Sequence, residues 1–220
     1  MFKGLSPGTT GVNTTLTEGS AGGRSELKEG TGMERFAAEY IAENQRLLAS
    51  LDPAEIAGVI EVVRQAGESG NRIYAVGNGG SASTASHFVN DMGKGASLGR
   101  KRRFKVVPLT DNVAWMTALS NDLCYEDVFV EQLRNFAEPG DVLIAISGSG
   151  NSENVLRAVR YANQVGCRTV GFAGFKGGKL KDLVQHCIVV DADHMGRIED
   201  MHMMLQHMIC YYFMDRGPAK

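Results

Sequence analysis

The sequence predicts a doubly wound α/β fold, flavodoxin-like or Rossmann-like, with a parallel sheet of about five strands flanked by helices. Two observations predict this class. Short, continuous runs of Val, Ile and Leu alternate with helical patterns along most of the chain, which is typical of parallel strands covered on both faces. In addition, glycine-rich loops follow two of the strands, and ligands bind such sheets beyond the carboxyl ends of the strands.

Two helices precede this alternation. Residues 34–51 carry apolar side chains at helical spacing. Residues 52–69 form the second helix, which begins with Asp52 as its N-cap and Pro53 at its first helical position. Residues 1–32, by contrast, are rich in Gly, Ser and Thr and lack apolar periodicity, so we expect a flexible tail there.

The strands and helices then follow one another in order. The predicted strands are residues 72–77, 104–110, 141–147, 168–174 and 186–192. The predicted helices are residues 81–95, 125–137, 152–165, 179–185 and 197–215, with a short helix or turn at 112–121. Pro108 fits the second strand least well, because proline cannot donate a hydrogen bond within a sheet. At 220 residues the chain is long enough for one domain, which we place at residues 33–220.

Composition and charge argue against several functional classes. The hydrophobic content of 43% supports a sizeable core, and a net charge of −2 with a pI near 6.2 gives no sign of nucleic-acid binding. The basic run Arg100–Arg103 is interpreted as a solvated loop. No apolar run approaches membrane-spanning length, and the N-terminus lacks the apolar core of a secretory signal. We therefore expect neither a nucleic-acid partner nor a membrane.

The cysteines indicate a reducing compartment. They are widely spaced and form no C-x-x-C pair: Cys124, Cys167, Cys187 and Cys210. Their apolar neighbourhoods predict reduced, buried thiols. We therefore expect a cytoplasmic protein.

The two glycine-rich loops, residues 76–83 (VGNGGSAS) and 146–152 (ISGSGNS), each join a predicted strand to the N-terminus of a helix. Free backbone N–H groups, the positive end of a helix dipole and small side chains together favour binding of an anion. Ser147, Ser149 and Ser152 add neutral hydrogen-bond donors to the second loop. A simple tight turn could explain one such loop, but two loops at equivalent strand ends favour a phosphate site. Such a site can hold a phosphate without a lysine.

A dinucleotide site is the competing interpretation of the first loop. Residues 77–82 satisfy the pattern G-x-G-x-x-G/A. That pattern also requires an acidic residue about 20 positions further on, at the end of the next strand. The candidate, Asp111, lies 29 residues beyond Ala82 (111 − 82). Neither loop is followed by G-K-[ST], so no P-loop is predicted, and dinucleotide binding leaves the serine-rich second loop unexplained.

Five segments, taken together, resemble the sugar isomerase (SIS) domain family, and within it the phosphoheptose isomerases. The segments are GNGGSASTASHF (77–88), LSNDLCYEDVF (119–129), GDVLIAISGSGNSENVLRA (140–158), GFAGFKGGKL (171–180) and RIEDMHMMLQH (197–207). The resemblance extends from about residue 34 to residue 215. It implies a homotetramer with active sites between subunits, and a serine loop that holds the phosphate of a sugar.

The resemblance also implies which residues form the site. The residues implied to contact the substrate are Asn78, Gly79, Gly80, Ser81, Asp91, Asn121, Asp122, Ser147, Gly148, Ser149, Ser152 and Glu199. The residues implied to bind zinc or another divalent metal are His87, Asp91, Glu199 and His207. Three of these positions depart from the residues usual in the family: Gly148 replaces Ser or Thr, Asp91 replaces Glu, and Glu199 replaces Gln. The shorter Asp91 retracts its carboxylate by about one C–C bond, and a misplacement of about 1 Å can cost on the order of 100-fold in rate.

Spacing along the helices supports part of this metal set and leaves an alternative open. His87 and Asp91 are four residues apart and share a helix face. Glu199 and His207 are eight residues apart, which separates them by about 12 Å along a helix axis, near the limit of side-chain reach to one ion. Spacing alone favours Glu199 with His202, an E-x-x-H pair. Without the support of a motif, we interpret His202 as a structural residue.

The function expected from the resemblance is that of an aldose–ketose isomerase. It would convert sedoheptulose 7-phosphate to glycero-manno-heptose 7-phosphate through an enediol, as in heptose or lipopolysaccharide biosynthesis. Asp91 would take the proton from the carbon beside the carbonyl, and His207 would move protons on the oxygens. Two alternatives remain: an isomerase of another ketose phosphate, and a non-catalytic SIS module that binds sugar phosphates or acts as a protein scaffold. The presence of His87 and His207 argues against the second, because a scaffold has no chemical need for them.

Overall fold

The computed structural model describes residues 31–216, and its centre is a five-stranded sheet. The strands are β1 (Arg72–Val76), β2 (Lys105–Pro108), β3 (Val142–Ser147), β4 (Arg168–Gly174) and β5 (His186–Val190). Their order is β2-β1-β3-β4-β5, and each neighbouring pair is parallel. The predicted doubly wound α/β fold is confirmed. The tail predicted at residues 1–32 falls almost wholly outside the described residues.

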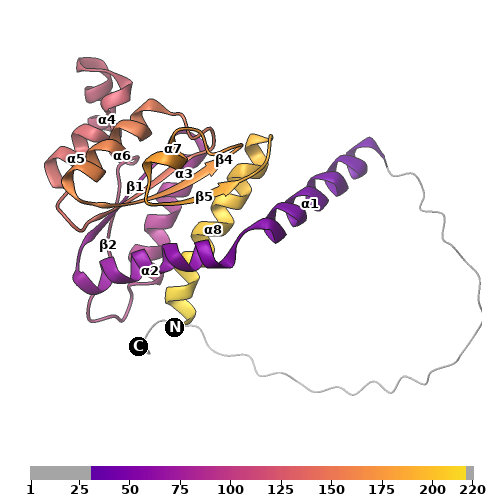
Figure 1. The fold of residues 1–220 in the computed structure, drawn as a ribbon, viewed down its shortest axis with the longest axis horizontal. Helices are drawn as coiled ribbons and strands as arrows, with labels where there is room; N and C mark the ends of the chain where they lie inside the picture. The colour runs from indigo at the N-terminus through magenta and orange to yellow at the C-terminus, as the bar shows by residue number, and fades with distance from the viewer. Residues whose placement is uncertain (1–30, 217–220) are drawn as a thin grey trace, which may run out of the picture.

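Helices cover both faces of this sheet (Figure 1). Those that pack on one face are α2 (Pro53–Ser69), α3 (Gly80–Asn90) and α8 (Met195–Asp215). Those on the other face are α4 (Val113–Asp122), α5 (Val130–Phe136), α6 (Glu153–Val165) and α7 (Leu180–Leu183). The remaining helix, α1 (Gly32–Ser50), leads into α2. This three-layer arrangement places the N-termini of α3 and α6 at the carboxyl ends of β1 and β3.

Successive strand residues point to opposite faces, which builds two hydrophobic cores from one sheet. In β1, Ile73 packs among α2, α3 and α8, whereas Tyr74 packs among α5 and α6. Ile144 and Leu143 divide in the same way in β3. All four side chains are fully buried, so the central strands read as continuous apolar runs. Pro108 is tolerated because β2 is an edge strand.

The start of α2 follows its predicted capping residue, whereas α6 starts without a side-chain cap. The Asp52 carboxylate accepts a hydrogen bond of 2.7 Å from the Ala54 N–H, and Pro53 is the first residue of α2. Ser152 is the N-cap residue of α6, but its side chain makes no capping hydrogen bond. The Ser152 hydroxyl is therefore available to another partner at the N-terminus of α6.

The helix predicted at residues 81–95 is correct as far as Asn90 and wrong in its last third. α3 ends at Asn90, and Asp91–Gly95 form a wider π-helical turn (η1), closed by a 2.9 Å hydrogen bond from the Ala96 N–H to the Asp91 carbonyl. Two glycines in five residues disfavour an α-helix. Gly95 also lets the chain approach the side chain of Met214 in α8. The π-helical turn begins at Asp91, one of the predicted site residues.

The helix predicted at residues 125–137 is likewise divided. A 3₁₀ turn, Tyr125–Asp127, precedes α5, which begins only at Val130. Within this turn the Asp127 carboxylate accepts a 2.8 Å hydrogen bond from Arg157 of α6. This contact between distant segments holds the turn against α6, and local periodicity does not report it.

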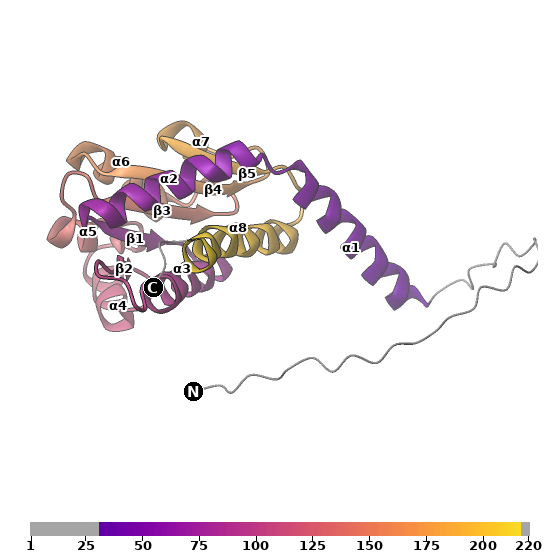
Figure 2. The same cartoon turned by 90° about the horizontal axis from the view of Figure 1, so that it is seen from below.

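The first helix extends away from the body of the molecule (Figures 1 and 2). Only Leu47 of α1 is buried, whereas Met33, Phe36 and Ile41 are more than half exposed. Two hydrogen bonds to Asp200 of α8, from Tyr40 and Asn44, fasten the helix at its middle. None of the helices in residues 31–216 combines the length and apolar character needed to cross a membrane.

Candidate functional site

A cluster of three side chains lies where α3 and α8 run side by side. His87 lies in the last turn of α3, Asp91 follows directly at the start of η1, and His207 lies in α8. One ligand atom of each lies within 4.8 Å of the others. The two imidazole Nε2 atoms are 3.2 Å apart. The Asp91 Oδ2 atom is 3.3 Å from the Nε2 of His87 and 3.7 Å from that of His207. The structure thus brings together three of the four residues predicted to bind metal.

The geometry of this cluster fits a divalent cation. The Asp91 Oδ2 atom is buried and has no hydrogen-bond partner, although it faces two imidazoles. A tetrahedral zinc ion with bonds of about 2.0–2.1 Å would hold its nitrogen ligands about 3.3 Å apart. The spacing of 3.2 Å between the two nitrogens and that of 3.3 Å from His87 to the Asp91 oxygen are close to this figure, whereas the spacing of 3.7 Å from His207 to Asp91 is slightly longer. Two imidazole nitrogens and a carboxylate oxygen are also a donor set that suits zinc.

Glu199 does not join the three-residue cluster. Its carboxylate occupies the space where a side chain at position 80 would begin, so Gly80 lets Glu199 approach the start of α3 closely. Glu199 is kept out of the cluster by its position on α8, because it lies about two helical turns before His207 and about 12 Å away along the helix axis. Glu199 therefore lies at the N-terminus of α3, where the helix dipole favours a negative charge.

The second glycine-rich loop, residues 147–152, is held rigidly between β3 and α6. The Gly148 carbonyl accepts a 2.9 Å hydrogen bond from the Gly174 N–H, and the Gly150 carbonyl accepts one of the same length from the Leu180 N–H. Ser147 is 4% exposed, and its hydroxyl lies 3.3 Å from that of Ser152. This fixed loop presents hydroxyls beside the uncapped N-terminus of α6, as an anion site requires.

Met195 covers the loop at Gly148. A side chain added at position 148 would run into the thioether of Met195, the first residue of α8. Met195 itself is 43% exposed, so it forms an apolar border to the serine loop. Met195 therefore occupies the space that a larger side chain at position 148 would need. No local pattern signals this contact, because the two residues are 47 positions apart (195 − 148).

In the first loop, Asn78 makes hydrogen bonds to protein groups. It exchanges two hydrogen bonds of 2.9 Å with Asn154, and its carbonyl oxygen also accepts one from the Tyr125 hydroxyl. Gly79 follows it with a φ of 53°, and Ser81 is buried in the first turn of α3. Asn154 and Tyr125 were not among the predicted site residues, although both lie in segments that carry the family resemblance.

Asn121 and Asp122 lie apart from the other predicted residues. Both are exposed at the end of α4, and the Asn121 amide donates a 2.8 Å hydrogen bond to the Asp122 carboxylate. Among residues 31–216, no hydrogen bond or ion pair links either of them to the two loops or to the three-residue cluster. A substrate contact for this pair therefore stays a prediction.

His202 is structural, as expected. It is fully buried in α8, and one ring nitrogen lies 3.2 Å from the Ala173 carbonyl of β4. Burial lowers the pKa of His202 to about 4, because the charged imidazolium would lose its hydration. A neutral imidazole in this position packs against the sheet and does not face the three-residue cluster.

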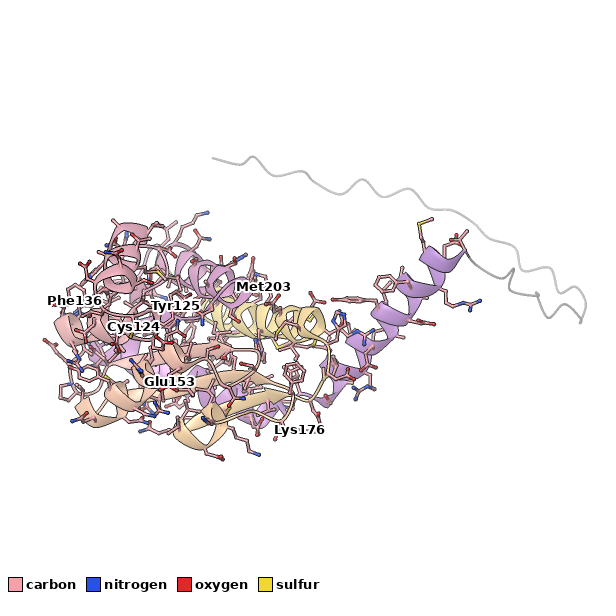
Figure 3. All side chains as sticks on the ribbon, turned by 90° about the horizontal axis from the view of Figure 1, so that it is seen from above. Cys124, Tyr125, Phe136, Glu153, Lys176 and Met203 are labelled. Carbon is pink, nitrogen blue, oxygen red and sulfur yellow. The ribbon has the colours of Figure 1, made fainter. Side chains whose placement is uncertain are left out.

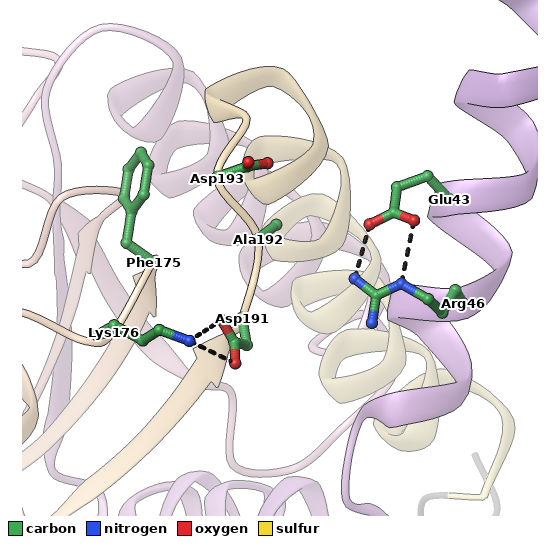
Figure 4. A pocket seen from close by; sticks show the side chains of 7 residues that line it. All are labelled: Glu43, Arg46, Phe175, Lys176, Asp191, Ala192 and Asp193. Carbon is green, nitrogen blue, oxygen red and sulfur yellow. Dashed lines mark hydrogen bonds and ion pairs between the residues drawn. The ribbon is translucent and has the colours of Figure 1, made fainter.

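A separate hollow of about 430 Å³ lies between α1 and the carboxyl ends of β4 and β5 (Figure 4). Its charged side chains are largely paired with one another. Lys176 contacts Asp191 at 2.8 Å, and Arg46 contacts Glu43 at 2.6 Å. None of the predicted site residues lines this hollow. We therefore place the candidate site at the two loops and the three-residue cluster.

Comparison with known proteins shows which family this chain resembles. The sequence profile of the SIS domain matches residues 39–174. A probable phosphoheptose isomerase of Thermoplasma acidophilum is 38% identical over 174 residues, covering 79% of this chain and 95% of that protein. The phosphoheptose isomerase of Helicobacter pylori is 36% identical over 174 residues, covering 78% and 90%. The solved phosphoheptose isomerase of Neisseria gonorrhoeae superposes with a TM-score of 0.76 at 31% identity, covering 83% of this chain and 98% of that one.

Proposed function

The chain belongs to the SIS domain family, and from this premise we propose that it is an aldose–ketose isomerase of the phosphoheptose isomerase type. The reaction converts sedoheptulose 7-phosphate to glycero-manno-heptose 7-phosphate. The observation that carries this proposal is the convergence of His87, Asp91 and His207 on one point. A module that only binds a sugar phosphate has no need of these groups, whereas proton transfer between neighbouring carbons does.

The phosphate group occupies the loop 147–152 in this proposal. The hydroxyls of Ser147, Ser149 and Ser152, with backbone N–H groups at the start of α6, donate hydrogen bonds to the phosphate oxygens. The rest of the sugar then extends toward α3. The binding energy of the phosphate, remote from the reacting carbons, positions those carbons for chemistry.

Proton transfer is assigned to Asp91 and His207. Asp91 removes the proton from the carbon beside the carbonyl, giving an enediol, and returns it to the neighbouring carbon. His207 moves protons between the two oxygens. His87 orients this pair, since its Nε2 atom lies near both side chains. Zinc or another divalent ion held by His87, Asp91 and His207 would stabilise negative charge on the substrate oxygens. Glu199, at the first loop, accepts hydrogen bonds from sugar hydroxyls.

A homotetramer with active sites between subunits is part of the proposal. The projecting helix α1 supports it, because this helix exposes Met33, Phe36 and Ile41 on a surface that water alone would cover in a monomer. Tyr211 and Tyr212 of α8 are also exposed, beside His207. The imidazoles of His87 and His207 are each about two-fifths exposed, which leaves room for a neighbouring subunit to complete the site.

We also place the enzyme in the cytoplasm, in heptose biosynthesis such as that of lipopolysaccharide. The cysteines support a reducing compartment, since all four are free thiols in the structure: Cys124, Cys167, Cys187 and Cys210. Burial raises the pKa of Cys167 and Cys187 to about 11, which keeps both thiols protonated and inert at neutral pH.

The proposal is tested with purified protein and sedoheptulose 7-phosphate. Aldose formation is followed for the wild type, for Asp91→Asn and for His207→Ala. The wild type is expected to turn the substrate over, with both variants reduced by at least about 1000-fold. Turnover that neither substitution affects would overturn the assignment of roles. Turnover of a different ketose phosphate in a substrate panel would overturn the choice of sugar but not the class of reaction.

A further inference from the structure

A pair of asparagine side chains joins the two glycine-rich loops. The Asn78 amide N–H donates to the Asn154 carbonyl oxygen at 2.9 Å, and the Asn154 amide N–H donates back to the Asn78 oxygen at 2.9 Å. Asn78 lies in the first loop, after β1, and Asn154 lies in the first turn of α6, directly after the second loop. Because β1 and β3 are neighbouring strands, the two loops meet at one edge of the sheet, and this pair spans them.

Asn154 is buried and Asn78 is half-buried, and the amide groups of both are nearly saturated with hydrogen bonds. Asn154 is 3% exposed, and its oxygen also accepts a 2.9 Å hydrogen bond from the Val155 N–H, which fixes its orientation. The Asn78 oxygen receives a further 2.9 Å hydrogen bond from the hydroxyl of Tyr125, a residue labelled in Figure 3. A buried amide left without partners costs about 1–3 kcal/mol, so the two side chains hold one another firmly.

The pair connects the two parts of the site that must act together. α3 starts at the first loop and carries His87 and Asp91 at its other end. α6 starts at the second loop, where the phosphate is proposed to bind. A hydrogen-bonded link between the starts of these helices fixes how far the phosphate lies from the proton-transfer groups.

From this arrangement we propose that Asn154 is a positioning residue, which holds the phosphate loop at a fixed distance from the His87–Asp91–His207 cluster through Asn78. This role rests on the proposed function. It acts on the alignment of the reacting carbons and not on affinity for the phosphate itself. A displacement of about 1 Å at the reacting atoms lowers a rate by on the order of 100-fold.

The test compares Asn154→Ala with a matched control, Asn163→Ala. Asn163 is an asparagine of the same helix, with hydrogen bonds of 2.8 Å to the Leu183 carbonyl and 2.9 Å from the Thr169 hydroxyl, and it lies at the far end of α6 from the loops. Three quantities are measured: kcat on sedoheptulose 7-phosphate, the inhibition constant of inorganic phosphate, and amide hydrogen exchange of both loops. Asn78→Ala and the double variant complete a cycle.

We expect Asn154→Ala to lower kcat by about 10- to 100-fold while the inhibition constant of phosphate changes by less than about threefold. Hydrogen exchange should quicken in both loops, and the double variant should lose little more activity than Asn78→Ala alone. Asn163→Ala should leave all of these unchanged. Equal losses of kcat and phosphate affinity would overturn the proposal in favour of a general disturbance of the loop. Losses that multiply in the double variant would also overturn it, because they would show that the two asparagines act independently.

The hydrogen-exchange measurement separates this proposal from the proposed function. A wild type that is inactive on the heptose phosphate would refute the function. Coupled loops would still show faster exchange at residues 77–80 and 147–152 in Asn154→Ala and not in the control Asn163→Ala. Exchange confined to the second loop would refute the link between the loops, whatever the activity.

Discussion

The Nε2 atoms of His87 and His207 lie 3.2 Å apart, although 120 residues separate the two histidines in the chain. Both rings point toward the buried, unpartnered Oδ2 atom of Asp91. Three groups that attract protons or cations thus lie close together, and the two imidazoles are partly exposed to solvent. Such a cluster is stabilised when it holds a cation or shares a proton among the three groups, and this is the physical basis of the proposed function.

Glu199→Gln tests whether metal binding requires a fourth protein ligand. Because the Glu199 carboxylate lies against Gly80 and not in the three-residue cluster, we expect the zinc affinity of the variant to stay within about threefold of the wild type. The loss of negative charge at the N-terminus of α3 should lower the free energy of unfolding by about 0.5 kcal/mol. Zinc titration and urea unfolding measure the two effects.

The control for this experiment is Glu39→Gln, which makes the same change at an exposed position of α1. It should alter neither quantity. A fall in zinc affinity of tenfold or more in Glu199→Gln alone would return Glu199 to the metal set.

Asp91→Glu tests the shortened carboxylate. The Asp91 Oδ2 atom already reaches within 3.3 Å of His87, and the side chain is only 15% exposed, so an added methylene has no free space toward the imidazoles. We expect kcat to fall by about 10-fold or more. Overpacking should also lower the free energy of unfolding by about 1–3 kcal/mol. Steady-state kinetics and urea unfolding check this. A variant faster than the wild type would show that Asp91 is retracted from its working position.

Ser147→Ala and Ser152→Ala test the phosphate loop. Each change removes one hydroxyl that can donate to a charged phosphate oxygen, a contact worth about 1.5–3 kcal/mol. The inhibition constant of inorganic phosphate should therefore rise by about 10- to 100-fold in each variant. Ser50→Ala, at the end of α1, serves as the control, because its hydroxyl bonds only to the Leu47 carbonyl. Unchanged inhibition by phosphate in both loop variants would exclude this loop as the phosphate site.

His202 predicts a loss of stability in mild acid. Burial lowers the pKa of this imidazole in the folded state to about 4, against 6.5 in the unfolded chain. Between these values the unfolded chain binds the extra proton, so stability is present above pH 6.5 and is lost as the pH falls toward 4. From pH 7 to pH 5 the contribution amounts to about 2 kcal/mol.

The variant His202→Gln isolates this effect, because glutamine keeps a donor for the Ala173 carbonyl but does not titrate. Urea unfolding at both pH values should show a smaller difference for the variant than for the wild type. If the wild type and the variant lose the same free energy of unfolding between the two pH values, the imidazole of His202 is not buried in its neutral form.

Local signals in the sequence accounted for the parts of the fold that neighbouring residues determine. Asp52 and Pro53 predicted the start of α2, and the carboxyl ends of the strands placed both glycine-rich loops at one edge of the sheet. The spacing of His87 and Asp91 put them on one helix face. The π-helical turn at Asp91 was missed, because helical periodicity does not reveal how Gly95 meets Met214 on another helix.

Contacts between distant segments were beyond the reach of periodicity and spacing. The positions of Glu199 against Gly80 and of Met195 against Gly148 depend on how α8 lies across the loops. The Asn78–Asn154 pair depends on the pairing of β1 with β3. Family resemblance gave the residues of the three-residue cluster, but only the packing of α3 on α8 shows that Glu199 lies outside it.

The most direct test of the central claim is the reaction carried out in heavy water. If Asp91 transfers a proton through an enediol in a site open to solvent, aldose formed from sedoheptulose 7-phosphate will carry deuterium on the carbon next to the new aldehyde, and Asp91→Asn will form neither product nor exchanged substrate. Product that contains no deuterium, or deuterium incorporated at the wild-type rate by Asp91→Asn, would contradict the account.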